Sequence, residues 1–201
     1  MSSERCSYPK MESADRLKMF EAEIALIADS DIRELVKQCL MKAPNYFFYM
    51  PASTSGRHHS AESNGKHGLV KHTKMLVAVA KELSRLEIFE KVNKDCAIAA
   101  CILHDTCKCG NDDDAATYEF EHPLLAGAFV KAIAYEMNFD KKSELALIKS
   151  AIESHMGQWN YNHVSYNKKW LPKPRTQTDF FVHLCDYLAS RKTILVQLNE
   201  E

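Results

Sequence analysis

The chain has 201 residues, of which 46% are hydrophobic and 26% charged, so it is long enough to bury the core of one soluble globular domain. Its formal net charge of -1 argues against nucleic-acid binding through bulk electrostatics, so any such partner must be held by a local basic patch. No run reaches the roughly 20 apolar residues that span a bilayer, and the N-terminus lacks the apolar core of a signal peptide. A cytoplasmic location without a membrane partner is therefore expected.

The N-terminal part of the chain shows helical periodicity followed by a long irregular segment. Two amphipathic helices are predicted over Met11–Asp29 and Asp31–Lys42, divided at "ADSD", and Pro44 ends the second. Residues 45–68 break the pattern and are rich in Ser, Gly and Asn. A segment of this length predicts a functional loop that partly covers a site.

Helical patterns dominate the rest of the chain. The predicted helices are Leu69–Leu86, Asn93–Asp105, His122–Asn138, Asp140–His155, and a last one from Thr176 past Ala189. A second long loop, residues 156–175, precedes the last helix. Because neither a repeat, a heptad series nor an alternation of period two is present, the predicted fold is all-α, with two long loops.

Each of these five helices carries polar groups on its apolar face. Residues three and four apart share a helix face, and on this basis the inward groups are His72, His104, Asp105, His122, His155, His183 and Asp186. One such histidine alone would more often be a hydrogen-bonded core residue. Several buried imidazoles and carboxylates cannot readily satisfy one another, whereas one or two divalent cations accept both donor types. A metal centre is the more economical interpretation.

Five segments in order carry a family resemblance: "GLVKHTKM", "LHDTCK", "EHPL", "ESHMGQW" and "HLCDYLAS". Together they resemble the HD-domain superfamily of metal-dependent phosphohydrolases, over residues 57–191. The resemblance implies an HD-domain helical bundle in which one metal is held by His72, His104, Asp105 and Asp186. His122 and His155 match the branches that hold two metals, in which the aspartate of the pair, here Asp105, bridges the ions. The implied cofactors are two divalent transition-metal ions of iron, manganese or zinc.

The flanking regions and the substrate are less specified. Residues 1–56 are expected to belong to the same globule, and residues 192–201 to form a tail. The series "PAS", "RHH" and "HGLVKHT" is similar to segments of nucleic-acid-acting members, among them certain exoribonucleases and relaxase-associated HD domains. The chain departs from common patterns at Cys107 and His67, where many relatives have glycine, and it lacks the GYP signature of the cyclic-dinucleotide enzymes.

Two residues near the expected ligands have candidate supporting roles. Lys108 occupies the lysine position of the family's HDxxK pattern. The resemblance implies that Lys108 and Asp105 are catalytic residues and that Lys108 contacts phosphate as a point charge. A solvated cation past a helix C-terminus is the alternative. His183 lies one turn before Asp186 and either orients that ligand or is a plain core histidine.

The two loops supply the candidate substrate-binding residues. The second interleaves aromatic and basic side chains, including Trp159, Trp170 and Lys173, a mixture that stacks bases and meets phosphates. A loop packed by its own aromatics is the alternative. In the first loop, His58 and His59 are candidates for contact with a phosphate or a leaving group.

These observations predict a metal-dependent phosphohydrolase that cleaves a phosphoester of a nucleotide or short nucleic acid, with a phosphodiester slightly favoured. One alternative is an HD-type di-iron oxygenase acting on a small polyol or phosphonate. Another is a nucleotide sensor without catalytic activity. The sequence specifies neither the metal nor the oligomeric state.

Overall fold

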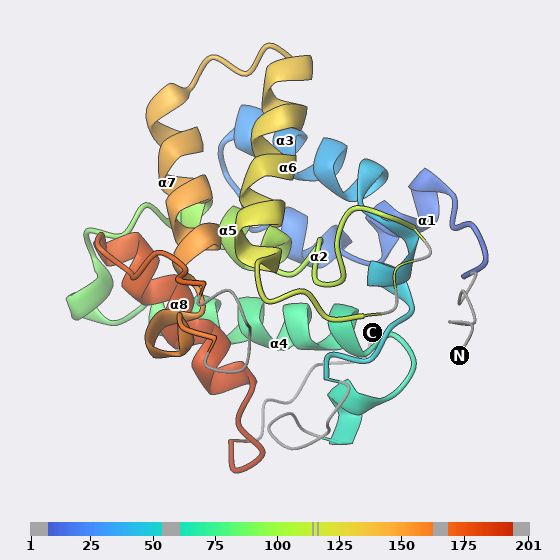
Figure 1. Cartoon of the computed structure of the whole chain (residues 1–201). Helices are drawn as coiled ribbons and strands as arrows, with labels where there is room; N and C mark the ends of the chain where they lie inside the picture. The colour runs from blue at the N-terminus through green and yellow to red at the C-terminus, as the bar shows by residue number, and fades with distance from the viewer. Residues whose placement is uncertain (1–7, 54–60, 114, 116, 163–168, 195–201) are drawn as a thin grey trace.

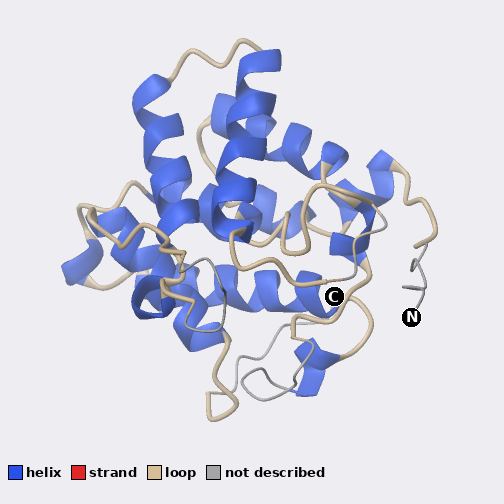
Figure 2. Cartoon of the chain, viewed as in Figure 1, coloured by secondary structure: helices blue, strands red, loops and turns tan. Residues whose placement is uncertain are grey.

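The computed structural model of the protein describes residues 8–53, 61–113, 115, 117–162 and 169–194 (Figure 1). Over these residues the chain forms eight α-helices, four short 3-10 helices and no strand, apart from one isolated bridge between Tyr161 and Trp170 (Figure 2). The all-α prediction is therefore confirmed. No helix among the described residues combines the length and apolarity needed to cross a membrane.

The N-terminal segment folds into three short helices, α1 (Ser13–Lys18), α2 (Glu21–Ile24) and α3 (Ser30–Lys42). The prediction of one continuous helix over residues 11–29 is wrong. The backbone of Phe20, with φ -121° and ψ 18°, leaves the helical region between α1 and α2. This break lets Phe20 become fully buried and stack on Phe47 at 5.9 Å between ring centroids. Tertiary packing thus overrides the local helical pattern.

The five later helices lie close to their predicted positions. They are α4 (Gly68–Leu83), α5 (Lys94–Leu103), α6 (His122–Glu136), α7 (Lys142–Ser154) and α8 (Gln177–Ala189). Polar side chains define two of the starts: Asn93 accepts a hydrogen bond from the backbone of Cys96 at α5, and Thr176 forms a capping box with Asp179 at α8. The short 3-10 helices are η1 (Asn45–Phe48), η2 (Ala61–Asn64), η3 (Glu87–Phe89) and η4 (Gly157–Trp159).

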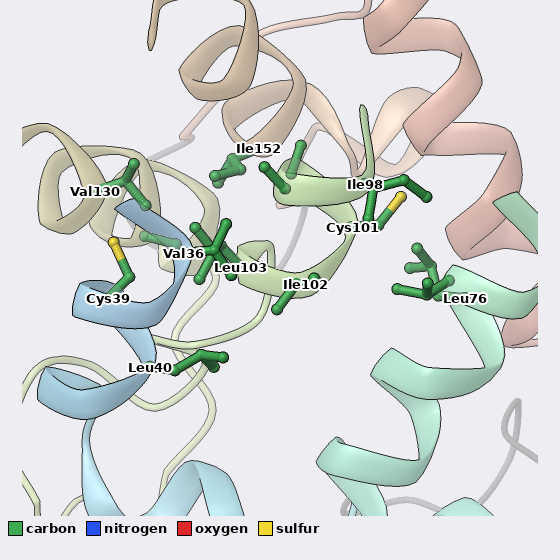
Figure 3. Close-up of a cluster of buried hydrophobic side chains, with 14 of the residues drawn as sticks. Val36, Cys39, Leu40, Leu76, Ile98, Cys101, Ile102, Leu103, Val130 and Ile152 are labelled. Atoms are coloured by element: carbon green, nitrogen blue, oxygen red, sulfur yellow. The ribbon is translucent and has the colours of Figure 1, made fainter. Parts of the chain in front are cut away.

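Helix α5 is the centre of the hydrophobic core. Every residue from Cys96 to Leu103 is buried, and the helix packs against α3, α4, α7 and α8. In Figure 3 its side chains lie between those of α3, such as Val36, and Leu76 of α4. Each fully buried large aliphatic side chain contributes about 1.5–3 kcal/mol. A helix this apolar stays inside the bundle, so its C-terminal end delivers His104 and Asp105 to the interior.

The described parts of the two long loops are held by backbone and ring contacts. In the first, Leu69 N–H at the start of α4 donates to Met50 O at 2.9 Å. Gly68 permits this approach, because a Cβ there would lie 2.1 Å from the carbonyl oxygen of Ser63. In the second, the rings of Tyr161 and Trp170 stack at 4.2 Å.

Candidate metal centre

Six polar side chains from five helices meet at one place beside α5. His72 lies within α4 and Asp186 within α8, whereas the others lie at helix ends: His104 and His155 directly follow α5 and α7, and His122 begins α6. Asp105 follows His104. All are buried except Asp186, whose side chain is 21% exposed. The inward orientation predicted from helical periodicity is therefore found for every member of this set.

Three of the histidines are oriented by the same local hydrogen bond. Nδ1 of His104, His122 and His155 lies 2.9, 2.8 and 2.7 Å from the carbonyl oxygen three residues earlier, at Cys101, Glu119 and Ile152 respectively. A carbonyl only accepts, so Nδ1 carries the hydrogen and donates it. In the neutral ring the lone pair then lies on Nε2, which faces the other members of the cluster. This arrangement fixes both the tautomer and the ring direction that a metal ligand requires.

The donor atoms form two overlapping groups, each with its ligand atoms within 4.8 Å of one another. In the first, His72 Nε2 lies 3.0 Å and His104 Nε2 lies 3.9 Å from Asp186 Oδ1. The second contains His104, Asp105 and His155.

Asp105 lies between the two groups. Its Oδ2 is 3.4 Å from His104 Nε2, and its Oδ1 is 3.1 Å from His122 Nε2 and 3.8 Å from His155 Nε2. The carboxylate therefore faces histidines of both groups.

The unsatisfied nitrogens test whether this set suits a cation. His104 Nε2 is buried and forms no hydrogen bond with any described residue. The Nε2 atoms of His122 and His155 face each other at 3.2 Å. Because both rings already donate through Nδ1, this contact brings two lone pairs together unless one ring carries a second proton. Neutral imidazole and carboxylate are ligands of zinc, iron and manganese, so the residues fit such an ion.

The electrostatics favour the protonation states that metal binding needs at Asp105 and His155, whereas at His104 they favour the protonated ring, whose proton on Nε2 a metal ion would displace. Burial, together with the neighbouring His104 and His122, lowers the pKa of His155 to about 3, so this ring is neutral near pH 7. Burial opposes ionisation of Asp105, but Lys108 and His104 outweigh it and hold the pKa of that carboxyl well below its usual range. Burial likewise opposes protonation of His104, but the adjacent carboxylates outweigh it and raise the pKa of that imidazole.

A comparison with protein families matches the HD domain to residues 69–191, more than half of the chain. The chain belongs to the HD-domain family. No curated protein and no solved structure matched the chain. The HD match begins at the first turn of α4 and ends just after α8, so it contains all six side chains of the cluster. Their roles as metal ligands stay a prediction; the HD family and the two donor groups support the coarser statement of a metal-dependent phosphohydrolase family.

Four of the six side chains of the cluster, Asp105, His122, His155 and Asp186, line a cavity of about 450 Å³. The lining residues come from both long loops, the start of α4, the segment between α5 and α6, the start of α6, the end of α7 and the end of α8. They are Met50, Pro51, Ala52, Ser53, Leu69, Asp105, Lys108, Cys109, Tyr118, His122, His155, Met156, Trp159, Asp186, Ser190 and Arg191. Lys108 is only 15% exposed, and its Nζ lies 2.5 Å from Asp105 Oδ2. It therefore faces the cluster, which differs from the solvated cation of the alternative interpretation.

The remaining predicted residues lie in different places. Trp159 lines the cavity, whereas Trp170 is 63% exposed and Lys173 is exposed, and neither is among the lining residues. His58 and His59 lie outside the described residues. His183 donates from Nδ1 to the carbonyl oxygen of His155 at 2.7 Å, so it braces the segment of His155. The substrate-binding roles of these residues stay predictions.

The lining residues that the sequence interpretation did not single out include the aromatic Tyr118 and the cationic Arg191. Tyr118 lies one turn before the start of α6, and its ring is 5.2 Å from that of His122. Arg191 follows the C-terminal end of α8. In the sequence, Arg191 follows Asp186 by just over one helical turn. This spacing indicates that Arg191 lies near the cavity only when Asp186 is already known to belong to the cluster.

Proposed function

We propose that this HD-domain protein is a metal-dependent phosphohydrolase that cleaves a phosphoester of a nucleotide or short nucleic acid, with a phosphodiester favoured. The observation that carries the proposal is the position of Lys108. Its ammonium group shares a cavity with the donor cluster and contacts Asp105. A cation beside metal ligands in a cavity is an arrangement suited to a phosphate group.

The proposed cofactors are two divalent transition-metal ions of iron, manganese or zinc. His72, His104 and Asp186 would hold one, and Asp105, His122 and His155 the other, with Asp105 contacting both. When bound, such ions lower the pKa of water and neutralise phosphate oxygens.

The charges around the cavity support an anionic substrate for the loaded protein. Among the described lining residues, the charged groups other than histidine are Asp105, Lys108, Asp186 and Arg191, whose formal charges cancel. Each divalent ion would therefore leave the site with a net positive charge, which attracts phosphate. As the phosphate arrives, Lys108 can exchange its contact with Asp105 for one with a phosphate oxygen, because its long side chain is flexible.

The test combines elemental analysis of the untagged protein with hydrolysis assays. Bis(p-nitrophenyl) phosphate, p-nitrophenyl phosphate and nucleotides are offered to protein loaded with manganese, iron or zinc. We expect about two ions per chain and faster hydrolysis of the diester. Asp105→Asn should lose metal and activity. The matched control is His67→Asn, outside the cluster, because asparagine tolerates the left-handed backbone (φ 61°) found there.

Each contrary result assigns the site differently. Two iron atoms per chain with oxygen consumption, but without phosphoester turnover, would indicate the di-iron oxygenase. Nucleotide binding without turnover under every metal would indicate the sensor. Normal hydrolysis by Asp105→Asn would contradict the metal-centre proposal itself.

A further inference from the structure

An aromatic and cationic cluster borders the cavity on the side of α8. The rings of Trp159 and Tyr187 stack with 5.6 Å between centroids and 12° between planes. The guanidinium carbon of Arg191 lies 4.6 Å from the Tyr187 centroid and 5.5 Å from that of Trp159. Trp159 remains 42% exposed. Trp159 lines the cavity and contacts Tyr187, Arg191 and His183, so part of an indole that neighbouring side chains hold in place is accessible to solvent.

Arg191 is held in place without neutralisation. Its Nε and Nη2 atoms donate to Ser190 Oγ at 3.3 and 3.0 Å, and that hydroxyl donates to the carbonyl oxygen of Tyr187 at 2.9 Å. No carboxylate of the described residues forms a salt bridge with Arg191. A guanidinium has five N–H donors, so the neutral Ser190 hydroxyl leaves most of them for another acceptor.

This cluster is linked to the metal centre by one turn of α8. Asp186 and Ser190 are four residues apart, which corresponds to about 6 Å along a helix axis, and both line the same cavity with Trp159 and Arg191. A ligand with a phosphate near Asp186 would therefore place its next chemical group beside the exposed indole. In a nucleotide that group is the sugar with its base.

We propose that Trp159, Tyr187 and Arg191 form a nucleobase subsite of the cavity, an inference that rests on the proposed phosphohydrolase function. The base stacks on Trp159, which Tyr187 supports from behind, and Arg191 donates hydrogen bonds to acceptor atoms of the same nucleotide. Base stacking on an aromatic side chain strengthens binding by roughly tenfold or more, and arginine adds a charge-assisted contribution. The subsite selects nucleoside phosphates over phosphoesters that lack a base.

The fluorescence of Trp159 provides a direct test. The chain has two tryptophans, so Trp170→Phe leaves Trp159 as the reporter. Metal-loaded protein is titrated with nucleoside 5′-monophosphates of the four bases and with ribose 5-phosphate, and chromatography verifies that each ligand is intact at the end. We expect saturable quenching by the nucleotides and at least tenfold weaker binding of ribose 5-phosphate. If millimolar nucleotide leaves the Trp159 emission unchanged, the proposal of a nucleobase subsite is wrong.

A matched pair of variants separates recognition from bulk charge and from packing. Arg191→Met retains an unbranched side chain against the rings, and Lys192→Met removes the same charge from the neighbouring exposed position. We expect Arg191→Met to weaken nucleotide binding roughly tenfold or more, with little change for ribose 5-phosphate, and Lys192→Met to bind as the parent does. If Arg191→Met weakens the binding of nucleotide and ribose 5-phosphate equally, or weakens neither, then Arg191 does not recognise the base and only stabilises the end of α8.

The same samples keep the two proposals distinguishable. Hydrolysis of bis(p-nitrophenyl) phosphate without a nucleotide response at Trp159 would reject the subsite and retain the phosphohydrolase. A nucleotide response with no hydrolysis of any phosphoester would retain the subsite and reject the phosphohydrolase.

Discussion

The substitution Gly157→Ala, which adds one methyl group, tests how the segment of His155 in the candidate metal centre is held in place. Gly157 has φ +55°, and a Cβ built there would lie 2.1 Å from Cε1 of His183 and within 2.4 Å of both ring nitrogens. The same ring donates to the carbonyl oxygen of His155. Gly157→Ala therefore forces the imidazole of His183 out of its place, and this removes the brace of a predicted ligand.

The expected destabilisation has two parts. A non-glycine residue in the left-handed region costs about 1–2 kcal/mol, and loss of the hydrogen bond from His183 to His155 costs about 0.5–1.5 kcal/mol. The free energy of unfolding should thus fall by about 1.5–3.5 kcal/mol, which for a protein of this size lowers the Tm by roughly 5–10 °C. This is a large share of a typical stability of about 5–15 kcal/mol.

Equilibrium unfolding in urea, on metal-free protein, measures this loss. Gly110→Ala is the matched control, because Gly110 also has a positive φ, +99°, but nothing lies within 4 Å of its Cβ position. Gly110→Ala should lower the free energy of unfolding only by the cost of the positive φ, without a steric clash. In a His183→Ala background the cost of Gly157→Ala should shrink toward about 1–2 kcal/mol. An identical cost in both backgrounds would refute the steric reasoning.

Three further predictions concern the cluster itself. Lys108→Ala should keep its metal but lower the kcat for the phosphodiester by about a hundredfold; an emptied site would instead make Lys108 part of the ligand framework. Chelation should lower the Tm, because an ion at a hundred times its Kd contributes about 2.7 kcal/mol, and identical melting curves with and without chelator would contradict metal binding. Metal-free protein should lose stability as the pH falls from about 6.5 to about 3, because the pKa of His155 lies near 3 when folded and near 6.5 when unfolded, so the unfolded chain binds more protons in that window. Urea midpoints against pH measure this effect, and His155→Phe should show a shallower slope than the parent.

Local patterns predicted the helices and the inward direction of the cluster because both depend on short spacings. His72 shares a helix face with Leu69 and Leu76, and it is 1% exposed in the folded protein. His104 and Asp105 end an apolar stretch that can only be buried. The spacing of three and four residues is a property of the helix alone, so no tertiary information was needed.

Features that depend on the docking of distant segments were beyond the sequence. The break at Phe20 arises from its packing on Phe47, a contact that helical periodicity does not encode. Trp159 and Trp170 belong to one loop of uniform aromatic and basic composition, yet only Trp159 lines the cavity. The composition of a loop indicates which kinds of ligand it can contact. Which of its side chains lines the cavity depends on how the loop packs on α8.

The bond between His72 and Asp186 joins residues 114 positions apart in the chain. The first and the last helix of the HD region must therefore be docked before the first donor group exists. Closing so long a loop is among the slower events of folding, and during synthesis α8 is the last of these helices to leave the ribosome. A nascent chain that ends before α8 carries five of the six donors but lacks Asp186. Metal binding at full affinity would therefore require α8 to be synthesised and docked, so it would begin only when the HD region has folded.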